Sequence, residues 1–247
     1  MKTALIFLIA WMIAASAWAE FPSGEEVLRR VDENMVYDQA KSTSTMVIHG
    51  RSGTRTITSS SWSRGRDSSL VEYLSPPRER GKKMLRLGDK VWNYTPEPND
   101  RIIAISGHLL RQSVMGSDLS YEDLTENPSL RALYVAEVTG EEELAERACW
   151  VVDLTAKTED VTYQTRKLWV DQGRWLPLKE ERFAKSGRLL KTTTMEEVFE
   201  VSGRWYPKRM TFKDMLQKGG ETEFIIEAID FEVEVPDHML TKGALRK

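Results

Sequence analysis

The chain has 247 residues, a formal net charge of −3 and a single cysteine, Cys149. A charge this small gives no electrostatic indication of nucleic-acid binding. One cysteine excludes an intramolecular disulfide framework, so the stability of the fold must come from a hydrophobic core.

The first residues have the pattern of a secretory signal peptide. Lys2 precedes an apolar run from Ala4 to Ala15, and Ala17-Trp18-Ala19 has the small residues of a cleavage site. We expect residues 1–19 to be a signal peptide cleaved near Ala19 and the mature protein to be soluble in the periplasm. A retained membrane anchor is the alternative, which the shortness of the run disfavours. Residues 20–247 contain no Pro-, Gly- or Ser-rich linker, which favours a single domain.

An amphipathic helix is predicted near Ser23 to Tyr37. Ser23 is a favoured N-cap residue, and Glu25 and Glu26 follow it in the first turn. Apolar residues then recur at helical spacing, namely Val27, Leu28, Val31, Met35 and Val36.

From Thr43 the sequence changes to short runs of β-branched and aromatic residues separated by Gly, Pro, Asn or Asp, which predicts a large antiparallel sheet. In the first half, strands are expected near Thr43–His49, Thr54–Ser63, Ser69–Leu74, Lys82–Leu87, Lys90–Tyr94 and Arg101–Ile105. In the second half, they are expected near Tyr134–Thr139, Ala148–Thr155, Thr165–Val170, Pro177–Ala184, Lys191–Val201, Trp205–Lys213 and Thr222–Val233. A long sheet with one apolar face must curl around something, and few helices are available to fill it.

The stretch from Arg111 to Leu124, RQSVMGSDLSYEDL, interrupts the strands with a helical or loop-like segment of mixed apolar and acidic residues. Gly116 permits a change of direction within it, and Gly107 and Asn127-Pro128 bound it. Two interpretations remain open: Leu110 to Leu124 is a movable lid over a curved sheet, or it is a crossover that seals a core. Short helical turns are also predicted at Ser129 to Leu133 and Pro236 to Leu240.

The sequence offers weak support for catalysis or metal binding. His49, His108 and His238 are far apart and have no ligand-type neighbours, so no metal site is expected. Ser106, His108 and Asp118 could suggest a serine hydrolase, but the chain has no Gly-x-Ser-x-Gly turn. We therefore expect a protein that is not an enzyme and that carries no cofactor.

Three acidic residues, Asp118, Glu122 and Asp123, lie close together in the interrupting segment. They could form a paired-carboxylate site. Acidic residues near the start of a short helix are more often exposed residues that favour the helix, and we prefer that interpretation.

The run Met115 to Leu124, MGSDLSYEDL, resembles the signature of the LolA-like outer-membrane lipoprotein-sorting protein family. The order of other features is also similar to that family across nearly the whole mature chain. These features are the signal peptide, the first helix, Leu74-Ser75-Pro76-Pro77 followed by Gly81-Lys82, and Lys90 to Pro96.

The resemblance implies a mainly β fold with a few helices: an incompletely closed, strongly curved antiparallel β-barrel capped by helices, with an apolar cavity for acyl chains. It implies a periplasmic carrier or chaperone that shields lipoprotein acyl chains or another lipid during transport toward the outer membrane. The implied partners are an inner-membrane exporter of RND or ABC type and an outer-membrane acceptor. A lipid-sensing regulatory module of the same fold is the alternative.

We predict that the lipid contacts residues of the lid and of nearby strands. These are Leu110, Val114, Met115, Leu119, Tyr121, Leu124, Trp92, Tyr94 and Ile103. The enterobacterial LolA chaperone uses an arginine to hold its helical lid. The resemblance does not assign that arginine to Arg51, Arg55 or Arg64.

Overall fold

The computed structural model describes residues 21–247 apart from residues 52, 66, 127–128 and 218. The predicted signal peptide and the predicted Asn127-Pro128 turn lie outside the described residues. None of the described helices combines the length and apolar character that crossing a bilayer requires.

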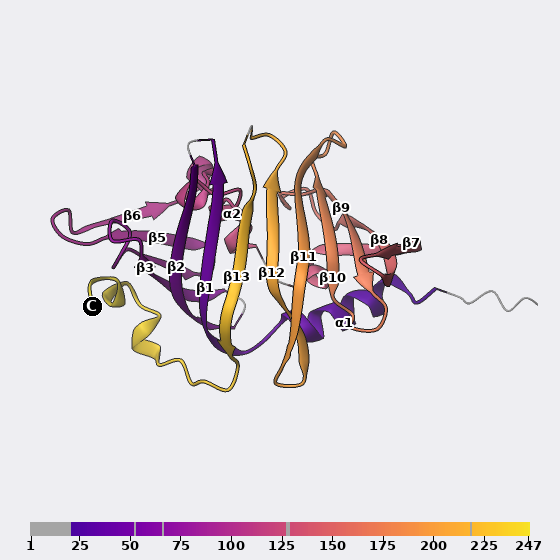
Figure 1. The fold of residues 1–247 in the computed structure, drawn as a ribbon, viewed down its shortest axis with the longest axis horizontal. Helices are drawn as coiled ribbons and strands as arrows, with labels where there is room; N and C mark the ends of the chain where they lie inside the picture. The colour runs from indigo at the N-terminus through magenta and orange to yellow at the C-terminus, as the bar shows by residue number, and fades with distance from the viewer. Residues whose placement is uncertain (1–20, 52, 66, 127–128, 218) are drawn as a thin grey trace, which may run out of the picture.

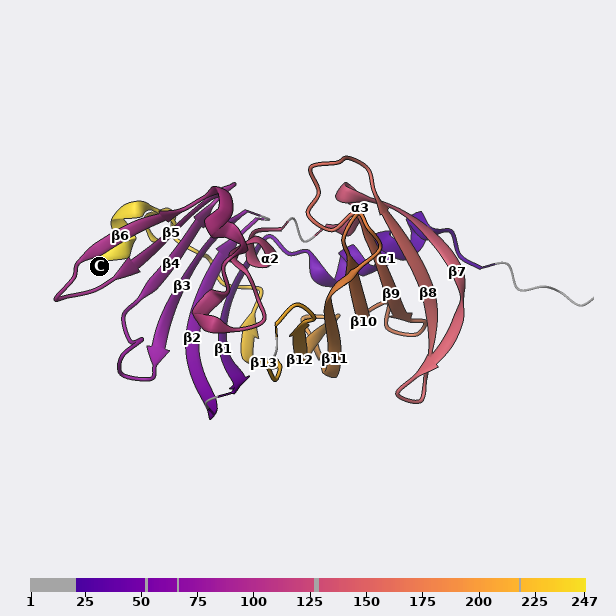
Figure 2. The ribbon, with the colours of Figure 1, turned by 90° about the horizontal axis from the view of Figure 1, so that it is seen from above.

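Within the described residues, thirteen strands form one antiparallel sheet, in the order β6-β5-β4-β3-β2-β1-β13-β12-β11-β10-β9-β8-β7 (Figure 1). The strands are β1 (Gln39–Gly50), β2 (Gly53–Arg64), β3 (Ser68–Ser75), β4 (Lys83–Leu87), β5 (Lys90–Thr95), β6 (Arg101–Ile105), β7 (Tyr134–Leu144), β8 (Arg147–Ala156), β9 (Thr165–Asp171), β10 (Pro177–Phe183), β11 (Leu189–Val201), β12 (Arg204–Asp214) and β13 (Thr222–Asp230). Figure 2 shows that the sheet curls into a trough whose edges, β6 and β7, do not meet. The predicted curved, incompletely closed barrel is confirmed.

Each predicted run of strand residues is a strand, and the differences lie at the ends. β7 continues to Leu144, beyond the predicted end at Thr139, because its polar end still pairs with β8 after an irregularity between Val138 and Gly140. β13 ends at Asp230, before the predicted Val233. The Asp230 carboxylate accepts a hydrogen bond from the backbone N–H of Glu232 at 2.8 Å, which turns the chain out of the sheet.

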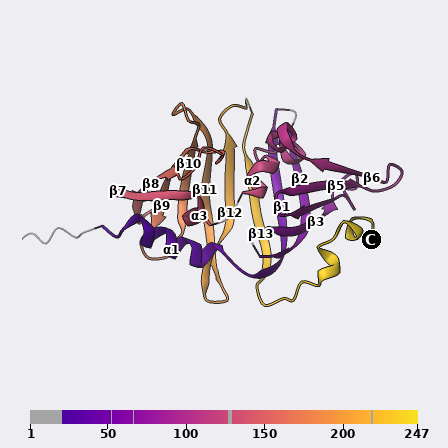
Figure 3. The ribbon, with the colours of Figure 1, turned by 180° about the vertical axis from the view of Figure 1, so that it is seen from behind.

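The helical elements are α1 (Gly24–Met35), η1 (Gly107–Arg111), η2 (Val114–Gly116), α2 (Tyr121–Thr125), α3 (Leu130–Leu133), η3 (Asp237–Met239) and η4 (Lys242–Arg246). Figure 3 shows α1, α2 and α3 in front of the sheet when the molecule is seen from behind, so these helices lie inside the trough. The helices therefore cover the inner face of the sheet, as the resemblance implied.

Helix α1 fills one half of the trough. The Ser23 hydroxyl caps it by accepting a hydrogen bond from the Glu26 N–H at 3.2 Å. A Cβ atom at Gly24 would lie 2.0 Å from the Ala136 carbonyl oxygen, so only glycine allows α1 to start this close to β7. Val27 and Leu28 are fully buried against β7, β8 and β9, and each such side chain contributes roughly 1.5–3 kcal/mol.

The segment from η1 to α2 fills the other half. Leu109 and Leu110 of η1, with Tyr121 and Leu124 of α2, pack against a buried cluster formed by Met84, Val91 and Ile105 of β4, β5 and β6. The interrupting segment thus seals a core in this half of the trough.

The end of the chain covers part of the outer face. Val235, Leu240 and Leu245 pack against Leu70 and Leu85, in a cluster that also includes Tyr94. The predicted turn at Pro236 to Leu240 is present as η3, whereas η4 was not predicted. Strands β3 to β5 are therefore apolar on both faces.

Candidate functional site

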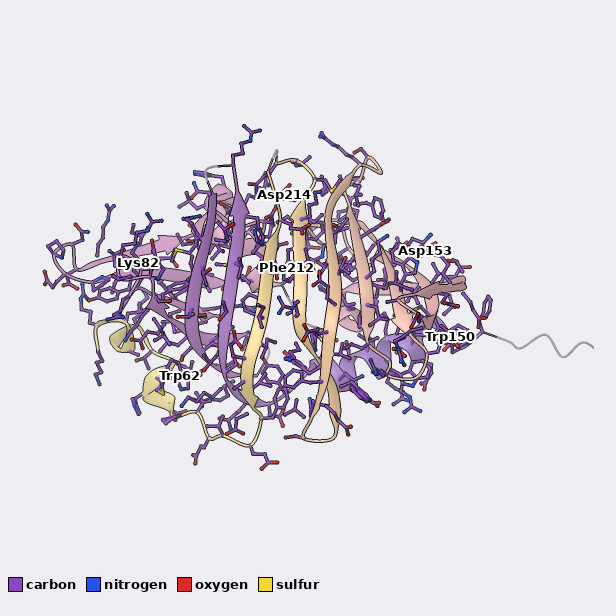
Figure 4. All side chains as sticks on the ribbon, viewed as in Figure 1. Trp62, Lys82, Trp150, Asp153, Phe212 and Asp214 are labelled. Carbon is purple, nitrogen blue, oxygen red and sulfur yellow. The ribbon has the colours of Figure 1, made fainter. Side chains whose placement is uncertain are left out.

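A cavity of about 430 Å³ lies between the two packed halves of the trough. This volume is within the usual range for small-molecule pockets, about 300–1,000 Å³. The central sheet contributes Met195, Met210, Phe212 and Phe224, and helices α2 and α3 contribute Leu124 and Leu130. Figure 4 marks Phe212 in the middle of the sheet, on β12. The cavity therefore has an apolar floor and helical cover.

The register of the sheet explains why these side chains share one face. Met195 lies opposite Met210, and Met210 lies opposite Phe224, on three neighbouring strands. Directly paired residues of an antiparallel sheet point to the same side, so the three side chains form one apolar row across the floor.

One wall of the cavity is a buried network of charged side chains. The Arg166 guanidinium donates to the Glu180 carboxylate at 2.7 Å and also pairs with Glu126. Arg182 donates to the same Glu180 carboxylate at 2.8 Å. The Arg166 Nε–H donates to the Tyr134 hydroxyl at 2.7 Å.

Asp123 of α2 joins this network across the cavity. Its carboxylate accepts hydrogen bonds from the Tyr163 hydroxyl at 2.6 Å and from Arg182 at 3.2 Å, and it pairs with Lys191. It also accepts one from the Ser120 N–H at 2.7 Å, which caps α2. The side chain of Asp123 is only 2% exposed. Asp123 therefore ties α2 to the opposite strands, β10 and β11.

The charges of the network balance. Three cations, Arg166, Arg182 and Lys191, face three carboxylates, Asp123, Glu126 and Glu180. Burial disfavours the ionised carboxylates, but neighbouring cations outweigh it and lower the pKa of both Asp123 and Glu180 to about 2. The carboxylates of this wall are therefore ionised, and the wall carries no net charge that would attract a charged ligand.

We expect acid to reduce the contribution of this charged network to the stability of the fold. In the unfolded chain the pKa of Asp is about 3.9 and that of Glu about 4.3. Because the folded-state pKa values of Asp123 and Glu180 are lower, their stabilisation is fully present above about pH 5 and is lost as the pH falls toward 2. We expect roughly 2 kcal/mol from each carboxyl over that window. Urea unfolding between pH 7 and pH 2.5 measures it, and an equally steep acid dependence in Asp123→Asn would contradict it.

Asp118 anchors the interrupting segment at a second point. Its carboxylate accepts hydrogen bonds from the Thr222 hydroxyl at 2.7 Å and from the Asp214 N–H at 3.0 Å. Its own N–H donates to the Thr222 hydroxyl at 3.0 Å. The preferred interpretation of Asp118 and Asp123 as exposed surface residues was therefore wrong, because both carboxylates have buried partners far away in the sequence.

The bend within η2 requires unusual backbone angles. Met115 and Gly116 have φ values of 54° and 74°, in the left-handed region. A Cβ at Gly116 would lie 2.9 Å from the Arg55 Nη2. The same Nη2 donates to the Met115 carbonyl at 2.7 Å, so Arg55 holds this bend. Arg64, in contrast, pairs with Asp237.

The structure separates the predicted lipid-contacting residues into two groups. Leu119 and Leu124 line the cavity. The others lie elsewhere. Leu110 and Tyr121 pack against the β4–β6 core, Val114 is buried, and Met115 packs beside Met46 and Tyr73. Ile103 lies on the edge strand and is 38% exposed, and the C-terminal segment covers Trp92 and Tyr94. Contact of any of these residues with a lipid stays a prediction.

The main sheet residues of the cavity are not among the residues that were predicted to contact the lipid. Met210 and Phe212 occupy alternate positions of β12, and Met195 and Phe224 lie on the neighbouring long strands β11 and β13, so the alternation was a usable signal. It did not show which face of each strand was the inner one.

The residues considered for catalysis or metal binding have surroundings that are common in folded proteins. The Asp118 carboxylate is held by Thr222 and the Asp214 N–H, as described above, and His108 is exposed in η1. Among the described residues, no three His, Cys, Asp or Glu side chains are grouped so that they could hold a metal ion. Burial raises the pKa of the Cys149 thiol to about 11, which keeps it protonated and unreactive.

Comparison with known proteins finds one matching family model and several solved structures with a similar fold. A family model described as "Uncharacterized protein" matches residues 65–247. A search of curated proteins finds no match.

Three solved structures are similar over most of the chain. A DUF1329 family protein from Desulfovibrio piger has a TM-score of 0.82 and 24% identity, covering 90% of this chain and 98% of its own. A putative outer membrane lipoprotein-sorting protein domain from Vibrio parahaemolyticus has 0.79 and 22%, covering 91% and 98%. A LolA superfamily protein from Nitrosomonas europaea has 0.74 and 24%, covering 91% and 100%. The chain therefore belongs to the family whose model matches residues 65–247, and it has the fold of the LolA-like outer-membrane lipoprotein-sorting proteins.

Proposed function

We propose that this protein is a periplasmic carrier that shields the acyl chains of a lipoprotein or another lipid during transfer toward the outer membrane. The observation that carries the proposal is the 430 Å³ cavity with an apolar floor under helices α2 and α3. The names of the LolA superfamily and lipoprotein-sorting neighbours support it.

Burial alone supplies enough free energy for this function. Each methylene removed from water contributes about 0.8 kcal/mol, so about ten methylenes contribute roughly 8 kcal/mol. That corresponds to a micromolar dissociation constant before the cost of ordering the chain. The proposal needs no covalent step and no catalytic residue.

The proposal includes two partners. An inner-membrane exporter of RND or ABC type would load the carrier, and an outer-membrane acceptor would unload it. The route through the periplasm is supported by the signal-peptide pattern of residues 1–19.

Lipid extraction of the mature protein purified from its own host tests the carrier function. We expect mass spectrometry to find a co-purified lipid with acyl chains. We also expect the protein to raise the rate of lipid transfer from donor to acceptor vesicles in proportion to its concentration. A lipid-free protein that does not bind fluorescent fatty acids would overturn the proposal. Binding without transfer would instead favour the lipid-sensing module.

A further inference from the structure

The cavity has a polar end that strands β2, β3 and β4 build. Ser63, Ser69 and Arg86 all line it. Ser63 lies opposite Ser69, and Ser69 lies opposite Arg86, so the three residues form one row across three neighbouring strands. The sheet itself therefore directs two hydroxyls and a guanidinium toward the same part of the cavity.

Arg86 differs from the other cations of the cavity wall. Arg166 and Arg182 are neutralised by the carboxylates of the network, and Lys179 pairs with Glu181 at 2.7 Å. Within the part of the chain that the structure describes, Arg86 has no carboxylate oxygen within 4.0 Å, and its Nε–H donates to the Gly88 carbonyl at 3.1 Å. Within the described residues, Arg86 thus carries a positive charge that no ion pair neutralises.

The surroundings of Arg86 make this charge costly. Burial lowers the pKa of the guanidinium, and the more distant charge of Asp67 opposes that effect in part. Arg86 is only partly buried, but a partly desolvated charge without an ion-pair partner is still unfavourable. An anion that enters the cavity would relieve that cost.

The hydroxyl of Ser63 is available for a stronger contact. Its two contacts, to the Tyr37 hydroxyl and the Ala40 carbonyl, are both 3.4 Å long, which is beyond the usual range for hydroxyl donors. A hydroxyl in this state can reorient toward a better acceptor.

We propose that Arg86, with Ser63 and Ser69, binds the anionic group of an acidic lipid, either the carboxylate of a fatty acid or the phosphate of a phospholipid. The inference rests on the proposed carrier function and specifies its substrate class. The planar guanidinium fork matches carboxylate and phosphate oxygens. The acyl chain then lies along the apolar floor formed by Met210, Phe212 and Phe224. The opposite wall is charge-balanced and does not compete for the anion.

Binding of three probes with the same oleoyl chain tests the inference: oleate, oleoyl lysophosphatidate and neutral monooleoylglycerol. We expect the wild-type protein to bind the two anionic probes more tightly than the neutral one. Arg86→Gln should weaken binding of the anionic probes by about tenfold, the effect of one charge-assisted hydrogen bond, and should leave binding of the neutral probe unchanged. Weakening for one anionic probe only identifies the source of the anion as carboxylate or phosphate.

Two further variants control for charge and folding. Arg188→Gln removes the same charge from an exposed hairpin and should bind all three probes like the wild type. Arg86→Lys keeps the charge and should retain a preference for the anionic probes. Equal binding of all probes, with no effect of Arg86→Gln at an unchanged urea midpoint, overturns the headgroup site and leaves the carrier function intact. Failure of the wild-type protein to bind any probe overturns the carrier function itself.

Discussion

Replacing Asp123 with Asn is expected to lower the free energy of unfolding by about 3–5 kcal/mol, the usual effect of removing one partner of a buried ion pair. The side chain is 2% exposed and pairs with Lys191 and Arg182. Asparagine would leave Lys191 without its anion in a position that is only 13% exposed. Urea unfolding at pH 7 measures the loss, which is a large part of the typical stability of a domain, about 5–15 kcal/mol.

Glu122→Gln provides the matched control for Asp123→Asn. Glu122 is the preceding acidic residue and accepts a hydrogen bond from the exposed Thr162 hydroxyl. Its replacement should change stability by about 0.5 kcal/mol or less. Adding Lys191→Met to Asp123→Asn should restore part of the loss, because the unpaired charge is removed. A loss below about 1 kcal/mol for Asp123→Asn would show that the ion pairs do not hold α2 in place.

The buried contacts of Asp123 also limit how the predicted lid could open. A lid that opens at α2 must break the contacts of Asp123 and those of Asp118 with Thr222 and the Asp214 N–H. We therefore expect opening, if the carrier uses it, to occur only when a lipid or partner compensates for these contacts. The movement of Leu110 to Leu124 stays a prediction.

Replacing Phe212 with Asp is expected to lower the affinity for oleate at least about 100-fold, or about 2.7 kcal/mol. Phe212 lines the cavity floor at the centre of the sheet. A carboxylate there would have to lose its hydration against the acyl chain, which costs several kcal/mol. Phe212 is half-buried and borders the cavity, so the loss of folding stability should be smaller than for Asp123→Asn. Oleate binding and urea midpoints, measured on the same preparations, separate the two effects.

Thr211→Asp is the control for Phe212→Asp. Thr211 is the adjacent residue on β12, and its hydroxyl donates to the exposed Glu196 at 2.6 Å, on the opposite face of the sheet. A carboxylate at this position should leave oleate affinity unchanged. If Phe212→Asp lowers the urea midpoint as severely as it lowers affinity, Phe212 is core and not a lipid-binding residue.

The secondary structure could be predicted from local sequence because its signals are local. Ser23 with Glu25 and Glu26 marks the start of α1, and alternating β-branched residues mark the strands. The curved shape followed from a long apolar sheet with few helices and from the motif between Met115 and Leu124.

The lipid-contacting residues could not be chosen from the same signals. Alternation shows which residues of a strand share a face, but not which face is the inner one. Trp92 and Tyr94 were predicted to contact the lipid, but they lie on the outer face of β5, where the C-terminal segment covers them. The outer face of β5 is therefore apolar as well as the inner face. Val91, which precedes Trp92 in the chain, faces the trough instead.

The sequence by itself determined the strands, the first helix and the family signature, because each depends on residues close together in the chain. Only the tertiary structure decided the roles of the charged residues. Asp123 and Lys191 are 68 residues apart in the sequence. Ser63 and Arg86 line the same part of the cavity only because the register of β2, β3 and β4 places both opposite Ser69. Ion pairing and the convergence of polar side chains depend on distance in space, which sheet register sets and local sequence does not encode.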